Sequence, residues 1–310
     1  MNLHEHESDF NALAGIVSER LHIKESDVKR DYFIVYMLNK LAQSEWADRC
    51  VFKGGTSLSK CYPHSIERFS EDIDLTYLGM EEDDKTCDKS IRKIIAVMTE
   101  GAHSEKIPGE GNARNKSRKV WFEDQSTYIK LEIGSSVRPE PYSLKTIKSY
   151  IHEYLDDVSN LAAIERFGLE TVTINTLAIE RTFIDKVMAV KRHAICGTIN
   201  RKVRHIYDVV RLCKLPEIQT FLADSKQLKY ILQLTKNTDS HYLEKRNVPK
   251  EYNPLGAFDF ESWRSCFDDS IRAIYENLHN DLLYTDEWQN FNDAIECFER
   301  LDGIFENIGE

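Results

Sequence analysis

The residues best suited to chemistry in this 310-residue chain are two aspartates, Asp72 and Asp74, in a segment where acidic and apolar residues alternate. The alternation over residues 69–78 predicts a β-strand. On a strand, the two carboxylates project from one face, while Ile73 and Leu75 point to the other. Paired carboxylates supply the hard oxygen ligands that Mg²⁺ or Mn²⁺ prefers, with substrate phosphate and water completing the coordination. The segment therefore predicts a metal site.

A glycine turn precedes this strand. Gly54-Gly55 leads into a short helix expected at residues 57–62, and Thr56-Ser57 lies at its start. Backbone N–H groups at such a turn can approach a phosphate closely, and the two hydroxyls add donors at the positive end of the helix dipole. The turn is therefore a candidate phosphate-binding site.

A second strand supplies a third acid. Over residues 127–135, Lys130 and Glu132 share one face, and the intervening apolar residues share the other. If this strand neighbours the first, three carboxylates can hold one or two metal ions that orient a nucleophile and neutralise a leaving pyrophosphate. A D-x-D pair or a Gly-Gly turn is common by itself on protein surfaces, but their occurrence in this order favours a nucleotide site.

The elements around these motifs indicate an α+β first domain, residues 1–140. Helices are expected at residues 8–21, 27–45 and 86–101. Ser26-Asp27 is a candidate N-cap for the second of these helices. Residues 104–119 are expected to form a polar loop, and the runs 120–123 and 127–135 a hairpin joined by residues 124–126.

The second domain, residues 141–310, is expected to be mainly helical after a linker that contains Pro139 and Pro141. Its predicted helices cover residues 145–156, 176–194, 202–213, 217–234, 260–279 and 287–306.

Charge is unevenly distributed in a chain of net charge −11. Residues 180–214 carry nine Lys or Arg against three Asp or Glu, whereas residues 281–310 carry one Arg against nine acids. The basic segment and the loop 106–119 are expected to form a cradle for RNA phosphates. The alternative is a pair of ordinary solvated helices.

Compartment and redox state follow from simpler features. The seven cysteines are scattered and never form C-x-x-C, which indicates reduced thiols rather than a disulfide scaffold or a thiolate zinc site. No stretch approaches the roughly 20 apolar residues of a membrane helix, and the N-terminus lacks the pattern of a secretory signal. The sequence predicts a cytoplasmic protein without a membrane partner.

Two helices of the second domain carry further candidates. Lys186 on the helix 176–194 can reach a triphosphate as a point charge. On the helix 202–213, Arg204 and Asp208 are one turn apart. The alternative is that Arg204–Asp208, like Arg181–Asp185 on the preceding helix, is an ordinary i,i+4 ion pair that contributes only ~0.3–0.5 kcal/mol.

These motifs resemble a known family. The Gly54–Ser57 turn, the strand Arg68–Leu75 and the segment Lys130–Ile133 resemble the first motifs of DNA polymerase β-type nucleotidyltransferases, and more narrowly those of the AbiEii/MenA toxins of type IV toxin–antitoxin systems. Residues 180–192 and 204–208 resemble that family's later motifs. The resemblance implies a polymerase β-type nucleotidyltransferase core, a small mixed sheet with helices, followed by a mainly helical domain that contributes to the active-site cleft.

The resemblance also implies residue roles. Asp72 and Asp74 would bind metal, joined by Glu132, although a longer side chain stands there than the Asp sometimes found in the superfamily. The nucleotide-binding set would comprise Gly54, Gly55, Thr56, Ser57, Lys130 and Arg204. Lys186 would hold phosphate, and Asp208 would either position Lys186 or act as a base. Ser70 marks a position where phosphorylation can silence such toxins, since it would add charge beside the aspartates.

The expected function is metal-dependent transfer of an NMP from an NTP to RNA, most simply the acceptor end of a tRNA, with release of pyrophosphate. Such an enzyme would act as the toxin of a toxin–antitoxin or phage-defence (abortive infection) system, with a cognate antitoxin as a possible partner. One alternative is transfer to a protein or small-molecule acceptor. Another is a catalytically silent binding protein with the same fold.

Overall fold

The computed structural model describes residues 2–122, 127–243, 251–281, 283 and 287–309. The chain divides into two compact units, the first comprising Met1–Pro63 with Phe69–Leu177 and the second His64–Arg68 with Ala178–Glu310. The domain boundary expected near residue 140 therefore falls inside the first unit.

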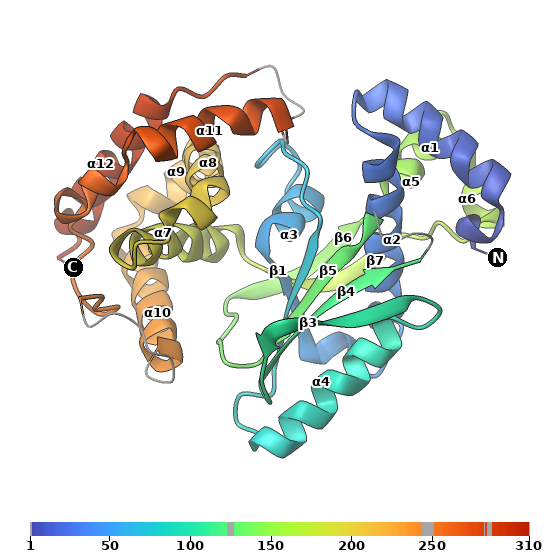
Figure 1. Cartoon of the computed structure of the whole chain (residues 1–310), viewed down its shortest axis with the longest axis horizontal. Helices are drawn as coiled ribbons and strands as arrows, with labels where there is room; N and C mark the ends of the chain where they lie inside the picture. The colour runs from blue at the N-terminus through green and yellow to red at the C-terminus, as the bar shows by residue number, and fades with distance from the viewer. Residues whose placement is uncertain (1, 123–126, 244–250, 282, 284–286, 310) are drawn as a thin grey trace. The chain divides into compact units, whose positions relative to one another are not determined.

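A mixed sheet of seven strands forms the centre of the first unit, in the order β3-β4-β5-β2-β1-β7-β6 (Figure 1). The strands are β1 (Cys50–Lys53), β2 (Asp72–Tyr77), β3 (His103–Gly111), β4 (Asn115–Trp121), β5 (Ile129–Gly134), β6 (Tyr142–Ile147) and β7 (Val172–Leu177). β1 pairs with β7 and β2 with β5 in parallel, and the other neighbours are antiparallel. The expected α+β class and mixed sheet are confirmed.

Helices cover this sheet, and Figure 1 shows α4 lying along it near β3 and β4. The helices are α1 (Glu7–Leu21), α2 (Glu25–Ala42), α3 (Gly54–Cys61), α4 (Asp84–Met98), α5 (Tyr150–Asp157) and α6 (Leu161–Arg166), with short 3₁₀ turns at Leu3–Glu5 and Ala47–Arg49. The N-cap expected at Ser26-Asp27 is wrong, because α2 begins at Glu25 after Lys24. Asp27 instead lies in the first turn, where its charge favours the helix dipole.

The expectation of a polar loop at residues 104–119 is also wrong. These residues form the β3–β4 hairpin, whose outer strand β3 is exposed almost throughout. Neither face of β3 is buried, so its sequence has no reason to alternate between apolar and polar residues. The predicted hairpin of β4 and β5 is confirmed by their antiparallel register, and residues 123–126, which join them, lie outside the described residues.

Two strands replace parts of expected helices. β6 takes Tyr142–Ile147, so the helix expected from 145 begins only at Tyr150. β7 takes Val172–Leu177, and α7 begins at Ile179 rather than at 176. In β6 the first five residues are not buried, so the strand lacks the apolar pattern that would have indicated it.

The second unit is helical, as expected. Its helices are α7 (Ile179–Ile195), the 3₁₀ helix η4 (Ile199–Lys202), α8 (Val203–Leu212), α9 (Pro216–Ala223), α10 (Ser225–Leu243), the 3₁₀ turns Phe260–Ser262 and Arg264–Cys266, α11 (Asp269–Asp281) and α12 (Phe291–Asn307). The single helix expected at 217–234 is two helices, because the Asp224 carboxylate accepts from the N–H groups of Lys226 and Gln227 and starts α10. A cluster of aromatic rings, including Phe260, Trp263 and Phe298, forms the core under α12.

The seven cysteines are all free thiols. Within the described ranges, no helix has the length and apolar character needed to cross a membrane.

Candidate active site

The predicted acids of the first unit come from neighbouring strands. In the parallel register of β2 and β5, Asp72 lies beside Lys130 and Asp74 beside Glu132. Neighbouring residues of two paired strands share a face of the sheet, so all four side chains project from one side. Ile73 on β2 and its partner on β5, Leu131, are fully buried on the other side.

This face gathers negative charge. Burial, and then repulsion from Asp74, Glu71 and Glu132, raises the pKa of Asp72 to about 6. Lys130 offsets part of that charge: its ammonium lies 3.0 Å from a Glu110 carboxylate oxygen and also contacts Glu132. A cation placed here would relieve the repulsion that remains around Asp72.

The donor chemistry of this face fits a hard divalent cation. Asp72 and Asp74 present carboxylate oxygens, the preferred ligands of Mg²⁺. Glu132 is paired with Lys130 in this conformation. In the part of the chain that the structure describes, no three His, Cys, Asp or Glu side chains form a ready metal-binding group. The two aspartates would therefore hold the ion, and Glu132 could join them only by turning away from Lys130.

Gly54 lies against β2. Its φ is +83°, and a Cβ added there would lie 2.2 Å from the Asp74 Oδ2 atom. Glycine is required twice over, once for the left-handed backbone and once for the space that the Asp74 carboxylate occupies. The turn and the acid pair thus form one structural site.

The hydroxyls at the start of α3 are used within the unit. Thr56 is buried, donates to the backbone carbonyl of Asp72, and lies 3.0 Å from the Ser70 hydroxyl. Ser57 is also buried, and its hydroxyl donates to the carbonyl of Gly54 over 3.0 Å. The bond from Thr56 to Asp72 ties the turn to β2, and phosphate binding by the backbone N–H groups of Gly54 and Gly55 stays a prediction. Phosphate binding by the two hydroxyls stays a prediction.

Lys53 is not among the site residues predicted from the sequence. This residue ends β1 directly opposite Asp74, so that residues of three strands meet at one register position. Cross-strand partners of an antiparallel pair share a face, which puts a further cation on the side of the aspartates. A lysine immediately before Gly-Gly was the available signal.

The second unit contains a buried charge cluster. The Arg68 guanidinium binds the Asp208 carboxylate through two bonds of 2.7 and 2.8 Å, and the Lys186 ammonium lies 2.8 Å from the same carboxylate. Asp208 is 0% exposed and Lys186 4%. Burial alone would raise the pKa of Asp208, but the charges of Arg68 and Lys186 outweigh it and lower the pKa to about 2.

The low pKa bears on the two roles considered for Asp208. A general base works best with a pKa near the operating pH, and a carboxyl with a pKa of about 2 is a weak proton acceptor. The Asp208 carboxylate binds both Arg68 and Lys186, and this geometry suits a residue that positions Lys186. The possible Arg204–Asp208 pair is replaced by these partners, whereas the Arg181–Asp185 pair forms at 2.8 Å.

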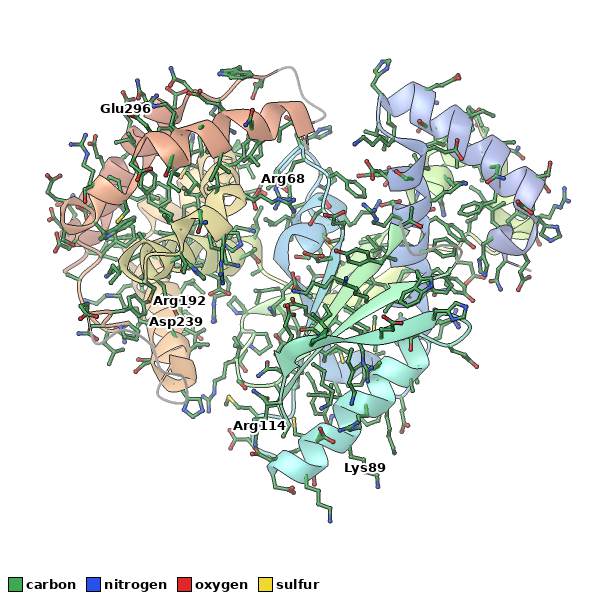
Figure 2. All side chains as sticks on the ribbon, in the orientation of Figure 1. Arg68, Lys89, Arg114, Arg192, Asp239 and Glu296 are labelled. Atoms are coloured by element: carbon green, nitrogen blue, oxygen red, sulfur yellow. The ribbon has the colours of Figure 1, made fainter. Side chains whose placement is uncertain are left out.

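Most cations of the segment 180–214 are bonded to other groups of the protein. The buried cations Arg181, Lys186 and Arg211 form ion pairs. Lys191 donates to the carbonyl of Ala257, and Arg192 lies 2.8 Å from Asp239. Figure 2 shows the last pair side by side. The exposed cations of the segment are Arg201, Arg204 and Lys214. The expected basic surface is therefore much smaller than the count of charges suggested.

Cations of the β3–β4 hairpin are also bonded within the protein. Arg114, labelled in Figure 2, bonds Asp84 at 2.6 Å and the carbonyls of Gly79 and Met80, and Lys116 pairs with Asp88. These contacts attach the hairpin to α4 and its preceding loop. Arg118 and Lys119 are the remaining cations of β4 for an RNA contact.

Comparison with known proteins identifies the family. The family model for the nucleotidyl transferase AbiEii toxin of type IV toxin–antitoxin systems matches residues 36–305. The chain belongs to the AbiEii family. It is a nucleotidyltransferase toxin of a type IV system, as the motifs around Asp72 and Lys186 had predicted.

Two solved structures are similar to this AbiEii protein. MenT4, a nucleotidyltransferase toxin from Mycobacterium tuberculosis, is 16% identical with a TM-score of 0.47, and the match covers 95% of this chain and 97% of that one. A putative nucleotidyltransferase from H. pylori is 16% identical with a TM-score of 0.39, and the match covers 83% and 98% of the two chains. No curated protein matches this chain.

Proposed function

We propose that this AbiEii protein transfers an NMP from an NTP to the acceptor end of a tRNA in a reaction that requires Mg²⁺ or Mn²⁺. The acceptor hydroxyl oxygen would form a bond to the α-phosphorus and lose its proton. The bond from that phosphorus to the bridging oxygen would break and release pyrophosphate. The single observation that carries the proposal is the placement of Asp72 and Asp74 on one face, against the glycine turn.

The residues of the first unit would divide the work. Asp72 and Asp74 would hold the metal, which when bound orients the nucleophile and stabilises charge on the phosphates. The N–H groups of Gly54 and Gly55 would bind the triphosphate at the start of α3. Lys130 would keep Glu132 in place or release it to the metal.

In the second unit, Lys186 would bind phosphate and Asp208 would position it. An ammonium group has three N–H donors, and one bond to Asp208 leaves two for a ligand. Lys186→Ala should then weaken NTP binding far more than RNA binding, because RNA contacts are spread over many charges. Calorimetry with NTP and a filter assay with RNA measure the two, and equal losses would assign Lys186 to a general basic surface.

The acceptor is the part to be tested first. Purified protein is incubated with each labelled NTP, Mg²⁺ and total RNA, and the labelled species is identified on a gel. Label in the tRNA band is expected, and it should disappear with EDTA and in Asp74→Ala. Label in a protein band, or only in a small molecule, would identify the other acceptor class. Absence of label from every species would support the silent binding protein.

Membership of the family implies an antitoxin partner. Expression of the protein alone should arrest growth, and Asp72→Ala should not. A harmless wild-type protein that still labels RNA would refute the toxic role in that host but leave the reaction intact.

A further inference from the structure

The second unit has a hollow that the proposed chemistry does not use. η4 and the start of α8 form one wall with Asn200, Arg201 and Arg204, and α11 forms the other with Ile274, Asn277 and Leu278. Its volume is about 420 Å³. That volume falls within the range of about 300–1,000 Å³ typical of small-molecule sites.

The wall at η4 carries two exposed cations of this unit. Arg201 and Arg204 are both exposed and both line the hollow. Neighbouring cations contribute to lowering the pKa of two histidines, His193 and His205. Burial and then Arg192, Lys202 and Arg201 lower the pKa of His193 to about 4, and burial and then Lys186 and Lys202 lower the pKa of His205.

The opposite wall is suited to a base. Ile274 is 39% exposed although it is a large apolar residue, and Leu278 lies one turn further along α11. Asn277 and Asn200 provide amides, which both donate and accept hydrogen bonds and can meet a base edge. Glu276, the acid beside Asn277 in the chain, interacts with Arg272. Guanidinium groups, amides and an apolar surface are the combination by which proteins hold an unstacked nucleotide.

We propose that this hollow binds one nucleotide of the single-stranded 3′ end of the acceptor RNA, with its phosphate on Arg201 and Arg204 and its base against Ile274 and Leu278. The inference rests on RNA as the acceptor. A free mononucleotide shares this chemistry, but a strand brings several phosphates to the exposed arginines and so gains more from them.

The test measures binding without transfer. A 5′-labelled single-stranded RNA is titrated with protein in EDTA, without NTP, and anisotropy is followed at several salt concentrations. Arg201→Glu should raise Kd at least tenfold. Loss of one phosphate contact should also make the negative slope of log K against log salt shallower by about 0.7.

Lys214→Glu is the matched control, because Lys214 is an exposed cation of the same segment that does not line the hollow. It should change Kd less than twofold. If Lys214→Glu weakens binding as much as Arg201→Glu, binding follows overall charge and the hollow is not the site. An unchanged Kd in Arg201→Glu overturns the proposal directly.

Two further arms separate the ligands. Asn277→Asp keeps the shape of the side chain but adds a negative charge, and it should raise Kd for single-stranded RNA severalfold, whereas an RNA duplex should bind weakly to every variant. NTP binding with Mg²⁺, followed by calorimetry, should be the same in Arg201→Glu and wild type. Loss of NTP binding with RNA binding retained would assign the hollow to the mononucleotide and overturn the proposal.

The outcome is separable from that of the acceptor assay. If wild type binds the RNA through Arg201 but labels no RNA, the proposed reaction fails and the binding site stands. If wild type labels RNA and Arg201→Glu both binds and labels it equally well, the reaction stands and the binding site fails.

Discussion

Asp72 in the first unit and Asp208 in the second are both carboxylates within candidate catalytic motifs, yet their surroundings act in opposite directions. Burial and neighbouring acids raise the pKa of Asp72 to about 6, whereas Arg68 and Lys186 hold that of Asp208 at about 2. Asp208 already has its cations within the protein. Asp72 has an excess of acids around it, as expected of a site that receives its cation from solution.

The largest effect on stability should come from removing the carboxylate that Arg68 and Lys186 share. Asp208→Ala leaves Arg68 and Lys186 buried without their shared anion, and should lower the free energy of unfolding by about 3–5 kcal/mol. Urea denaturation measures this. Glu299→Ala, which removes an exposed partner of Arg264, is the control and should cost less than about 1 kcal/mol. Equal losses would mean that the buried cluster is no more important than a surface pair.

Removing an acid from the face of β2 that carries Asp72 and Asp74 should reduce transfer activity without unfolding the protein. Asp74→Ala deletes a proposed metal ligand, and transfer should fall by on the order of 10²–10³-fold or more. Glu105→Ala, on the exposed strand β3, is the control. The labelled-NTP assay and a thermal melt together decide the matter, because an unfolded or a fully active Asp74→Ala protein contradicts the assignment.

A substitution in the glycine turn should displace the Asp74 carboxylate without removing it. Gly54→Ala would force a Cβ against Asp74, and transfer should fall about 10–100-fold as the carboxylate shifts out of position. Gly101→Ala has a similar backbone cost, since its φ is +78°, but meets nothing within 4 Å. Similar losses of stability but different activities are expected for the pair. Equal activity in the two would show that the contact with Asp74 does not matter.

The smallest effect concerns pH. Because the folded pKa of Asp72 is raised, its contribution to stability is present below the unfolded pKa of about 4 and is lost as pH rises through about 6. In EDTA at pH 8, Asp72→Asn should therefore be more stable than wild type by about 1–2 kcal/mol, after allowance for partial solvent screening. The difference should vanish near pH 4. Mg²⁺ should stabilise wild type and leave Asp72→Asn nearly unchanged.

The sequence predicted the placement of the acids on neighbouring strands because strand patterns are local. Asp72 and Glu132 follow from period-two patterns, and β2 and β5 are indeed neighbours. The β3–β4 hairpin was missed because exposed edge strands need no apolar face. Lys53 and Arg68 gained their importance only from pairings with Asp74 and Asp208, which no local pattern records.

The same limit applies to charge. Nine cations in residues 180–214 suggested a broad basic surface, but a count cannot tell a cation in solution from one bonded to Asp239 or to Ala257. Burial and partners decide that, and they depend on the tertiary fold.

Because the chain is made from its N-terminus, Arg68 is synthesised well before its partner Asp208. Residues 64–68 belong to the second unit, although the first unit contains the chain on both sides of them. Arg68 and Asp208 are 140 positions apart. On the ribosome, the strands that carry Asp72 and Glu132 are therefore made long before the anion that neutralises Arg68. In a nascent chain that stops before residue 208, Arg68 and Lys186 therefore lack the carboxylate that neutralises them both in the complete protein.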